Sequence, residues 1–190
     1  MYENPIVQAN MEKLKSFGYE FVEPESGHLA CNTSGKGRFP ALETIMDCAE
    51  KCIYGRELLK GKKVIVSAGG TQEKIDPVRY ISNRSSGRQG YAIAKAAWME
   101  GADVTLVSCT TALPKPYGVK MVYVQDAREL EKAMNAEYDT CDAAIMAAAV
   151  SDYRPTVQAD QKIKKEDFDY LHIDLTQNPD ILYGLGQKKR

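Results

Sequence analysis

The chain has 190 residues, of which 44% are hydrophobic and 27% are charged, and 25 basic residues nearly balance 26 acidic ones. This is the composition of an ordinary globular protein, and it excludes collagen, low-complexity disorder and a disulfide scaffold. The net charge of −1 creates no overall attraction to nucleic acid or to a membrane surface. Any anion must therefore be bound by local geometry.

The N-terminus and the cysteines favour a cytoplasmic protein. Residues 1–5 do not resemble a signal peptide, and there is no run of 18 apolar residues, so we expect no membrane association. Five cysteines are an odd number without zinc-ligand spacing. We interpret Cys48 and Cys52, four residues apart in a predicted helix, as small buried hydrophobic residues.

The first 60 residues predict two helices with a strand and a polar loop between them. The first helix spans 5–17, with Asn4 as its N-cap and Gly18 as the glycine that ends it. A short strand is expected over 19–22, and a glycine-bearing loop follows over 27–38.

Pro40 opens the second helix, which we expect to continue to about Leu59 and to be followed by a boundary at 61–63. The apolar residues at helical spacing predict one buried face, formed by Leu42, Ile45, Met46, Ala49 and Ile53.

Beyond this boundary, strands and helices alternate. Helices are expected over 90–100 and 126–138, with Asp126 as an N-cap, and strands over 64–68, 103–107, 119–124, 143–150 and 171–175. The packing stripe expected for the first helix is Ile93, Ala94, Ala97 and Trp98. The alternation predicts an open, doubly wound (Rossmann-like) α/β domain with a mostly parallel sheet. A partial α/β segment precedes it.

A long loop over 69–90 follows the first of these strands and ends at a helix N-terminus. Ser85, Ser86 and Gly87 at that point favour an anion site, because free N–H groups and the helix dipole attract phosphates. The loop has neither the G-x-G-x-x-G fingerprint nor a Walker A motif. The alternative is an irregular connection with a well-capped helix, although loops of this length usually carry function.

A second loop follows the strand over 143–150. The small residues Ala147, Ala148 and Ala149 would let a flat ligand lie close to the backbone, and Asp152 could hold a base, a ribose or a metal. The lysines over 162–165 could neutralise a polyphosphate or an oxyanion, although Lys164 and Lys165 are better interpreted as solvated charges.

Cys31 lies in the polar loop beside Lys36 and Arg38, which is the setting of a tuned acid or nucleophile. On chemistry alone, a structural thiol is the favoured interpretation. His28 and His172 are too isolated to predict a metal site.

Several motifs resemble those of the phosphopantothenate–cysteine ligase family, whose bacterial form is usually fused to a phosphopantothenoylcysteine decarboxylase. The ligase motifs lie in the family's order over about 63–182, in the segments 69–79, 83–87, 147–155, 162–165 and 178–182. Residues 1–14 and 29–38 resemble the decarboxylase, the latter its cysteine loop. The resemblance implies a decarboxylase (flavoprotein) tail over 1–60 and a ligase domain over 61–190 that is incomplete at its C-terminus.

The resemblance also implies a reaction in coenzyme A biosynthesis. CTP with Mg²⁺ activates the carboxylate of 4′-phosphopantothenate as an acyl-cytidylate, and the amine of cysteine then forms the amide. Asn83 matches the residue that contacts the acyl carbonyl, Lys162 the lysine near the reacting phosphate, and Arg79 the arginine of the cysteine half-reaction. In the decarboxylase, Cys31 would protonate the enethiol intermediate while reduced FMN returns a hydride.

The resemblance implies that residues of both loops and of the segment 178–182 bind the nucleotide together with Lys162. These residues are Gly70, Ser85, Ser86, Gly87, Gly90, Ala147, Ala148, Ala149, Asp152, Asn178, Pro179, Asp180, Ile181 and Leu182. The phosphates would hold Mg²⁺ without protein ligands, the main FMN site would lie upstream of Met1, and the full-length protein would be a homo-oligomer. The alternatives are a non-catalytic nucleotide-binding fragment and an NAD(P)-dependent oxidoreductase, against which the missing G-x-G-x-x-G argues.

Overall fold

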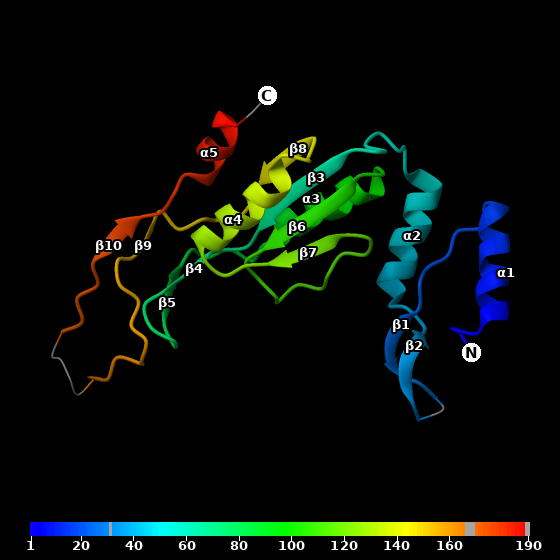
Figure 1. Cartoon of the computed structure of the whole chain (residues 1–190), viewed down its shortest axis with the longest axis horizontal. Coiled ribbons are helices and arrows are strands. Elements are labelled where there is room, and N and C mark those ends of the chain that lie inside the picture. The colour runs from blue at the N-terminus through cyan, green and yellow to red at the C-terminus, as the bar shows by residue number, and fades with distance from the viewer. Residues whose placement is uncertain (31, 166–169, 189–190) are drawn as a thin grey trace. The chain divides into compact units, whose positions relative to one another are not determined.

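The structure is a computed structural model that describes residues 1–30, 32–165 and 170–188 (Figure 1). The chain divides into two compact units, Met1–Gly55 and Arg56–Arg190, so the segment 61–63 lies within the second. Among the described residues, no helix is long and apolar enough to cross a membrane.

The first unit contains two helices and a hairpin: α1 (Pro5–Ser16), β1 (Glu25–His28), β2 (Ser34–Arg38) and α2 (Leu42–Tyr54). The predicted ends of α1 are confirmed. The Asn4 side chain accepts a hydrogen bond from Ile6 N at 2.9 Å, and Gly18 follows the helix with φ +87°, the left-handed conformation that glycine adopts without strain.

The hairpin was not predicted. The strand expected over 19–22 is wrong, and the expected loop over 27–38 contains β1 and β2 as an antiparallel pair. The turn between them is closed by a bond of 2.8 Å from Leu29 N to Thr33 O. Because the segment is rich in glycine and serine, backbone pairing forms these strands without any apolar alternation in the sequence.

The buried face predicted for α2 is also wrong. Leu42, Met46 and Ile53 are 69%, 58% and 68% exposed, and no described residue of Met1–Gly55 is buried. Periodicity predicts an apolar face, but the face is covered only where a second layer packs on it. The helix ends at Tyr54 instead of Leu59, with Gly55 as its C-cap. Cys52 is exposed, so its interpretation as a buried thiol is wrong as well.

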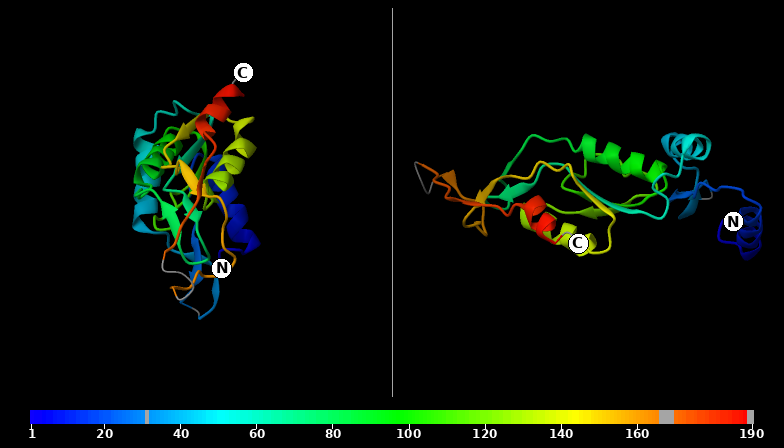
Figure 2. Two further views of the ribbon diagram at one scale, coloured as in Figure 1. Left: turned by 90° about the vertical axis from the view of Figure 1, so that its left-hand side faces the viewer. Right: turned by 90° about the horizontal axis from the view of Figure 1, so that it is seen from above.

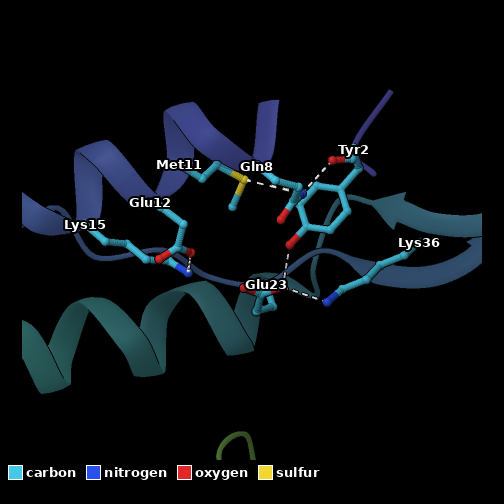
Figure 3. A network of polar contacts seen from close by, with 7 residues as sticks. All are labelled: Tyr2, Gln8, Met11, Glu12, Lys15, Glu23 and Lys36. Carbon is cyan, nitrogen blue, oxygen red and sulfur yellow. Dashed lines mark hydrogen bonds and ion pairs between the residues drawn. The ribbon is translucent and has the colours of Figure 1, made fainter. Parts of the chain in front are cut away.

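Polar contacts connect the start of the chain to the hairpin (Figure 3). Glu23 accepts a hydrogen bond from the Tyr2 hydroxyl at 2.5 Å and forms an ion pair of 2.7 Å with Lys36 of β2. The bond from Lys36 lowers the pKa of Glu23. Because both members of the ion pair are about 40% exposed to solvent, it contributes little to stability.

The second unit is built on a four-stranded sheet in which all neighbouring pairs are parallel. Its strand order is β7-β6-β3-β8, formed by β3 (Lys63–Ala68), β6 (Asp103–Ser108), β7 (Lys120–Tyr123) and β8 (Ala143–Met146). In the right-hand view of Figure 2, α3 (Arg88–Met99) covers one face, and α4 (Ala127–Tyr138) and α5 (Ile181–Gln187) cover the other. The predicted doubly wound α/β class is confirmed.

Both faces of the central strands are buried. From their second residue onward, β3 and β6 are buried throughout, as expected for strands between two layers of helices. Of the four α3 residues predicted to pack, Ala94, Ala97 and Trp98 are buried on one face and Ile93 is half-buried. On the other face, Leu130 and Met134 of α4 form a core cluster with Ile65, Val107, Cys109, Ile181 and Leu185.

The expected cap of α4 is present. The Asp126 side chain accepts a hydrogen bond from Glu129 N at 2.8 Å. The Glu129 carboxylate in turn accepts a hydrogen bond from Gln125 N at 2.7 Å. In a capping box it would accept from the backbone N–H of the N-cap residue, Asp126.

The larger differences from the prediction in this unit concern two strands and a loop. The strand expected to reach 150 ends at Met146, because the next two amides donate to the Ser67 hydroxyl at 3.1 Å instead of continuing the ladder. The strand over 171–175 is wrong: β10 (Leu175–Gln177) pairs instead with β9 (Tyr153–Pro155) in a separate antiparallel sheet. The loop over 69–90 contains a second small hairpin, β4 (Gln72–Lys74) and β5 (Tyr80–Ser82).

Candidate functional site

The candidate site lies where the order of the parallel strands reverses. From β3 the chain passes through α3 to β6 on one side, whereas β8 lies on the other side of β3. In open α/β sheets, ligands bind beyond the carboxyl ends of strands at such a point. The segments that leave β3 and β8 are the two loops that the sequence singled out.

Hydrogen bonds join these two segments beyond the sheet. Gly70 and Ala149 form an isolated parallel bridge, in which Ala149 N donates to Gly69 O at 2.8 Å and Thr71 N to Ala149 O at 3.3 Å. The buried Thr71 hydroxyl then accepts from Ser151 N at 3.0 Å. Thr71 therefore organises the candidate site. It lies in the 69–79 motif but was not selected as a site residue from the sequence.

Asn83 lies at the same junction, although it is far from the second loop in the sequence. Its side-chain amide donates to Val150 O at 3.0 Å. A carboxamide carries two N–H groups, so this bond uses one donor and leaves the other for a ligand.

Glycines bring backbone segments close together around α3. Gly87 is the N-cap of α3 with φ +77°, and the Ser86 hydroxyl lies 3.5 Å from Arg88 N. A Cβ atom at Gly70 would lie 2.6 Å from Asn83 O, and one at Gly90 would lie 2.5 Å from Ala68 Cβ. The amino end of α3 therefore lies directly on β3 and presents N–H groups and a positive dipole beside Ser85 and Ser86.

A cavity of about 330 Å³ lies beside the end of β8. Ala148, Asp152 and the segment 178–182, all predicted to frame a ligand, line it. Ala147, Ala149, Gly70, Gly90 and the 85–87 segment are not among its lining residues. The lining also includes residues that the sequence analysis did not select: Met146, Val150, Ser151 and Gln177.

Asn178 fixes the wall of this cavity. Its buried side-chain amide donates to Ser151 O at 2.8 Å, and its backbone N–H donates to Asp152 O at 2.7 Å. Its side-chain oxygen accepts from Arg154 at 3.1 Å. The next polar residue, Asp180, caps α5 by accepting from Tyr183 N at 2.9 Å. These two residues thus hold the turn in place, while Asp152 is exposed.

Arg79 points at a buried carboxylate. Its Nε donates to Asp76 Oδ2 at 2.9 Å, its Nη2 forms an ion pair with the same oxygen, and Nη2 also donates to Ile163 O at 3.0 Å. The Arg79 guanidinium, together with the backbone N–H groups of Val78, Arg79 and Ile163, holds the pKa of Asp76 well below its usual value. Asp76 was not among the residues selected from the sequence, although it belongs to the same 69–79 motif as Arg79.

The remaining candidates are less enclosed. Lys162 is exposed, Ser85 is half-buried and Ser86 is exposed. Cys31 lies outside the described residues. Within the part of the chain that the structure describes, no group of three or more His, Cys, Asp or Glu side chains could hold a metal ion.

Two family models match the chain. One, described as the DNA/pantothenate metabolism flavoprotein C-terminal domain, matches residues 59–190, and one described as Flavoprotein matches residues 1–54. The chain therefore belongs to the DNA/pantothenate metabolism flavoprotein family.

Curated relatives of this chain carry the name coenzyme A biosynthesis bifunctional protein CoaBC. The protein from Borreliella burgdorferi is 38% identical over 189 residues, which are 100% of this chain and 48% of the relative. The protein from Bacillus subtilis is 42% identical over 194 residues, covering 100% of this chain and 47% of the relative. The chain thus spans about half the length of the curated relatives it matches.

Solved structures share the fold. The crystal structure of the C-terminal domain of a CoaBC protein has a TM-score of 0.58 at 44% identity and covers 70% of this chain and 61% of that chain. The DNA/pantothenate metabolism flavoprotein from Streptococcus pneumoniae has a TM-score of 0.58 at 25% identity, with 67% and 65% covered.

Proposed function

We propose that the second unit is the nucleotide-binding part of a phosphopantothenate–cysteine ligase, which uses CTP to join 4′-phosphopantothenate to cysteine in coenzyme A biosynthesis in the cytoplasm. The observation that carries the proposal is the junction of the two loops. It brings the amino end of α3, the Asn83 side chain and the cavity lined by 178–182 to one edge of the sheet. Family membership and the CoaBC relatives support it.

Two parts of the site suit two parts of a nucleotide. The cavity of about 330 Å³ is at the small end of ligand pockets, so it fits a base and ribose better than a whole nucleoside triphosphate. Small residues line one wall, and Asp152 offers a carboxylate to a ribose hydroxyl or an amino group. The triphosphate would extend to the amino end of α3, where Ser85, Ser86 and Gly87 present donors to anionic oxygens.

The proposed reaction has two steps. The carboxylate of 4′-phosphopantothenate attacks the α-phosphorus of CTP, which releases pyrophosphate and forms an acyl-cytidylate. The amine of cysteine then attacks the acyl carbon, which forms the amide, releases CMP and gives up a proton. The α3 dipole and Lys162 would stabilise charge on the phosphates, and the free N–H of Asn83 would donate to the acyl oxygen. Mg²⁺ held by the phosphates would supply further positive charge.

The first unit is proposed as the tail of an FMN-dependent decarboxylase domain, with the domains spanning 1–60 and 61–190. The match of residues 1–54 to the Flavoprotein family supports this assignment. No described residue among Met1–Gly55 is buried, so these residues by themselves do not form an enclosed pocket for a flavin ring. The resemblance of residues 29–38 to the decarboxylase cysteine loop supports Cys31 as the acid of that reaction.

Calorimetry with CTP and with NADPH tests the nucleotide assignment. We expect CTP to bind and NADPH not to bind, and the reverse result would overturn the proposal in favour of an oxidoreductase. Mass spectrometry should then detect phosphopantothenoylcysteine from CTP, cysteine and 4′-phosphopantothenate. CTP binding without this product would favour a non-catalytic nucleotide-binding fragment.

Two variants test the residue assignments. Asn83→Asp and Lys162→Gln should abolish ligation without unfolding the chain, because both side chains are exposed. Lys164→Gln is the matched control, since Lys164 lies in the same segment and is interpreted as a solvated charge. Full activity in either Asn83→Asp or Lys162→Gln would show that the site is assigned wrongly.

A further inference from the structure

The segment that carries Lys162 is held to the first loop by a buried carboxylate. Ile163, the residue after Lys162, is bound on both sides of its backbone: its N–H donates to Asp76 Oδ2 at 3.2 Å, and its carbonyl accepts from Arg79 at 3.0 Å. A second connection runs from Ala159 N to Ile75 O at 2.9 Å. These contacts fix the backbone on both sides of Lys162, whose side chain is exposed.

We propose that Asp76 is a positioning residue, which acts through Ile163 to hold Lys162 beside the nucleotide phosphates. The proposal rests on the proposed function, because it assigns to Asp76 the placement of a lysine that meets CTP. Asp76 is well suited to the task, since it is only 1% exposed and its position is determined by several donors at once.

The bonding of Asp76 requires a carboxylate. Oδ1 accepts from Val78 N and Arg79 N at 2.8 Å each, and Oδ2 accepts from the Arg79 guanidinium and from Ile163 N. An asparagine has one accepting oxygen, so its NH₂ group would face either the first pair of donors or the second. Asp76→Asn should therefore release Ile163 or its neighbours while changing the side-chain volume very little.

The first test follows the segment itself and is independent of activity. Nuclear magnetic resonance of the wild-type chain should show slower hydrogen exchange at the Ile163 amide than at the amides of its exposed neighbours Lys162 and Lys164. In Asp76→Asn, trypsin should cleave after Lys162 and Lys164 at least about tenfold faster, because cleavage requires local opening. Asp160→Asn, an exposed carboxylate in the same segment, is the control and should leave the cleavage rate unchanged. Fast exchange at Ile163 in the wild type would overturn the proposal without any variant.

The second test separates positioning from general stability by a double-mutant cycle in CTP affinity. Asp76→Asn and Lys162→Gln should each weaken CTP binding about tenfold, and the double variant should be no weaker than Lys162→Gln alone. Additive losses, about a hundredfold in the double variant, would show that Asp76 does not act through Lys162. If the wild-type chain binds no CTP, the proposed function fails. If the chain binds CTP but the two losses are additive, only the positioning role of Asp76 is refuted. The fluorescence of Trp98 checks that each variant is folded.

Discussion

Gly90 should be intolerant of even a methyl group, because α3 packs its backbone directly on β3. An alanine Cβ at this position would lie 2.5 Å from Ala68 Cβ and 2.7 Å from Ser67 O. Carbon atoms in contact prefer about 3.5–4.0 Å, so the helix would have to move by about 1 Å. The atoms in the way belong to a buried strand, and they cannot rotate aside as the end of a long side chain could.

The expected magnitude is the difference of two effects. Overpacking costs about 1–3 kcal/mol, whereas replacing a helical glycine by alanine gains up to about 1 kcal/mol. Gly90→Ala should therefore lower the free energy of unfolding by about 1–2 kcal/mol, or the melting temperature by about 2–8 °C. Gly184 in α5 is a matched control, because nothing lies within 4 Å of its added Cβ, and Gly184→Ala should stabilise by up to about 1 kcal/mol.

Urea unfolding followed by fluorescence is the appropriate assay. Trp98 is the single tryptophan of the chain and is buried in α3, so its emission reports on the unit that contains both substitutions. The shift of the helix should also weaken CTP binding, because the amino end of α3 would be displaced from the end of β3 on which it lies. If Gly90→Ala raises the unfolding midpoint as Gly184→Ala does, the close approach of α3 to β3 is not real.

Three further predictions concern buried polar groups. Tyr91→Phe removes hydrogen bonds to Ser108 Oγ at 3.0 Å and to a backbone carbonyl, and should destabilise by about 1 kcal/mol in the same urea assay. Burial raises the pKa of Cys109 to about 12, so at pH 8 a thiol reagent should label the exposed Cys52 in the native chain but label Cys109 only after unfolding, as peptide mapping would show. The pKa of Asp76 is lowered by folding, so its stabilisation is complete above its unfolded pKa of about 3.9 and is lost as the pH falls below it. The unfolding midpoints of wild type and Asp76→Asn should therefore approach each other as the pH falls below about 4, and a constant difference would argue against this assignment.

Local signals predicted the regular elements of the second unit well. The apolar runs at β3 and β6, the packing stripe of α3 and the Asp126 cap each depend on residues close together in the sequence. The two loops proposed to bind the ligand were also recognisable, because serine, glycine and alanine at strand ends and helix starts have a local meaning. These features require no knowledge of which strands are neighbours.

Predictions failed where the outcome depended on distant partners. The apolar stripe of α2 is exposed, because periodicity cannot show whether another layer covers it. The strand predicted over 171–175 is found instead at Leu175–Gln177, because β10 forms only where β9 pairs with it. The β1–β2 hairpin likewise depends on backbone pairing that the pattern of side chains does not indicate.

The α/β class, the family and the two loops that carry the candidate site can be read from the amino-acid sequence, because they are encoded in short motifs. Only the folded chain shows that Thr71 and Asn83 join those loops and that Asp76 holds the segment of Lys162. These contacts link residues between 67 and 87 positions apart, which are brought together only when β8 is placed beside β3. The Asp76 carboxylate meets Ile163 only in this topology, so its role could be assigned only from the folded chain.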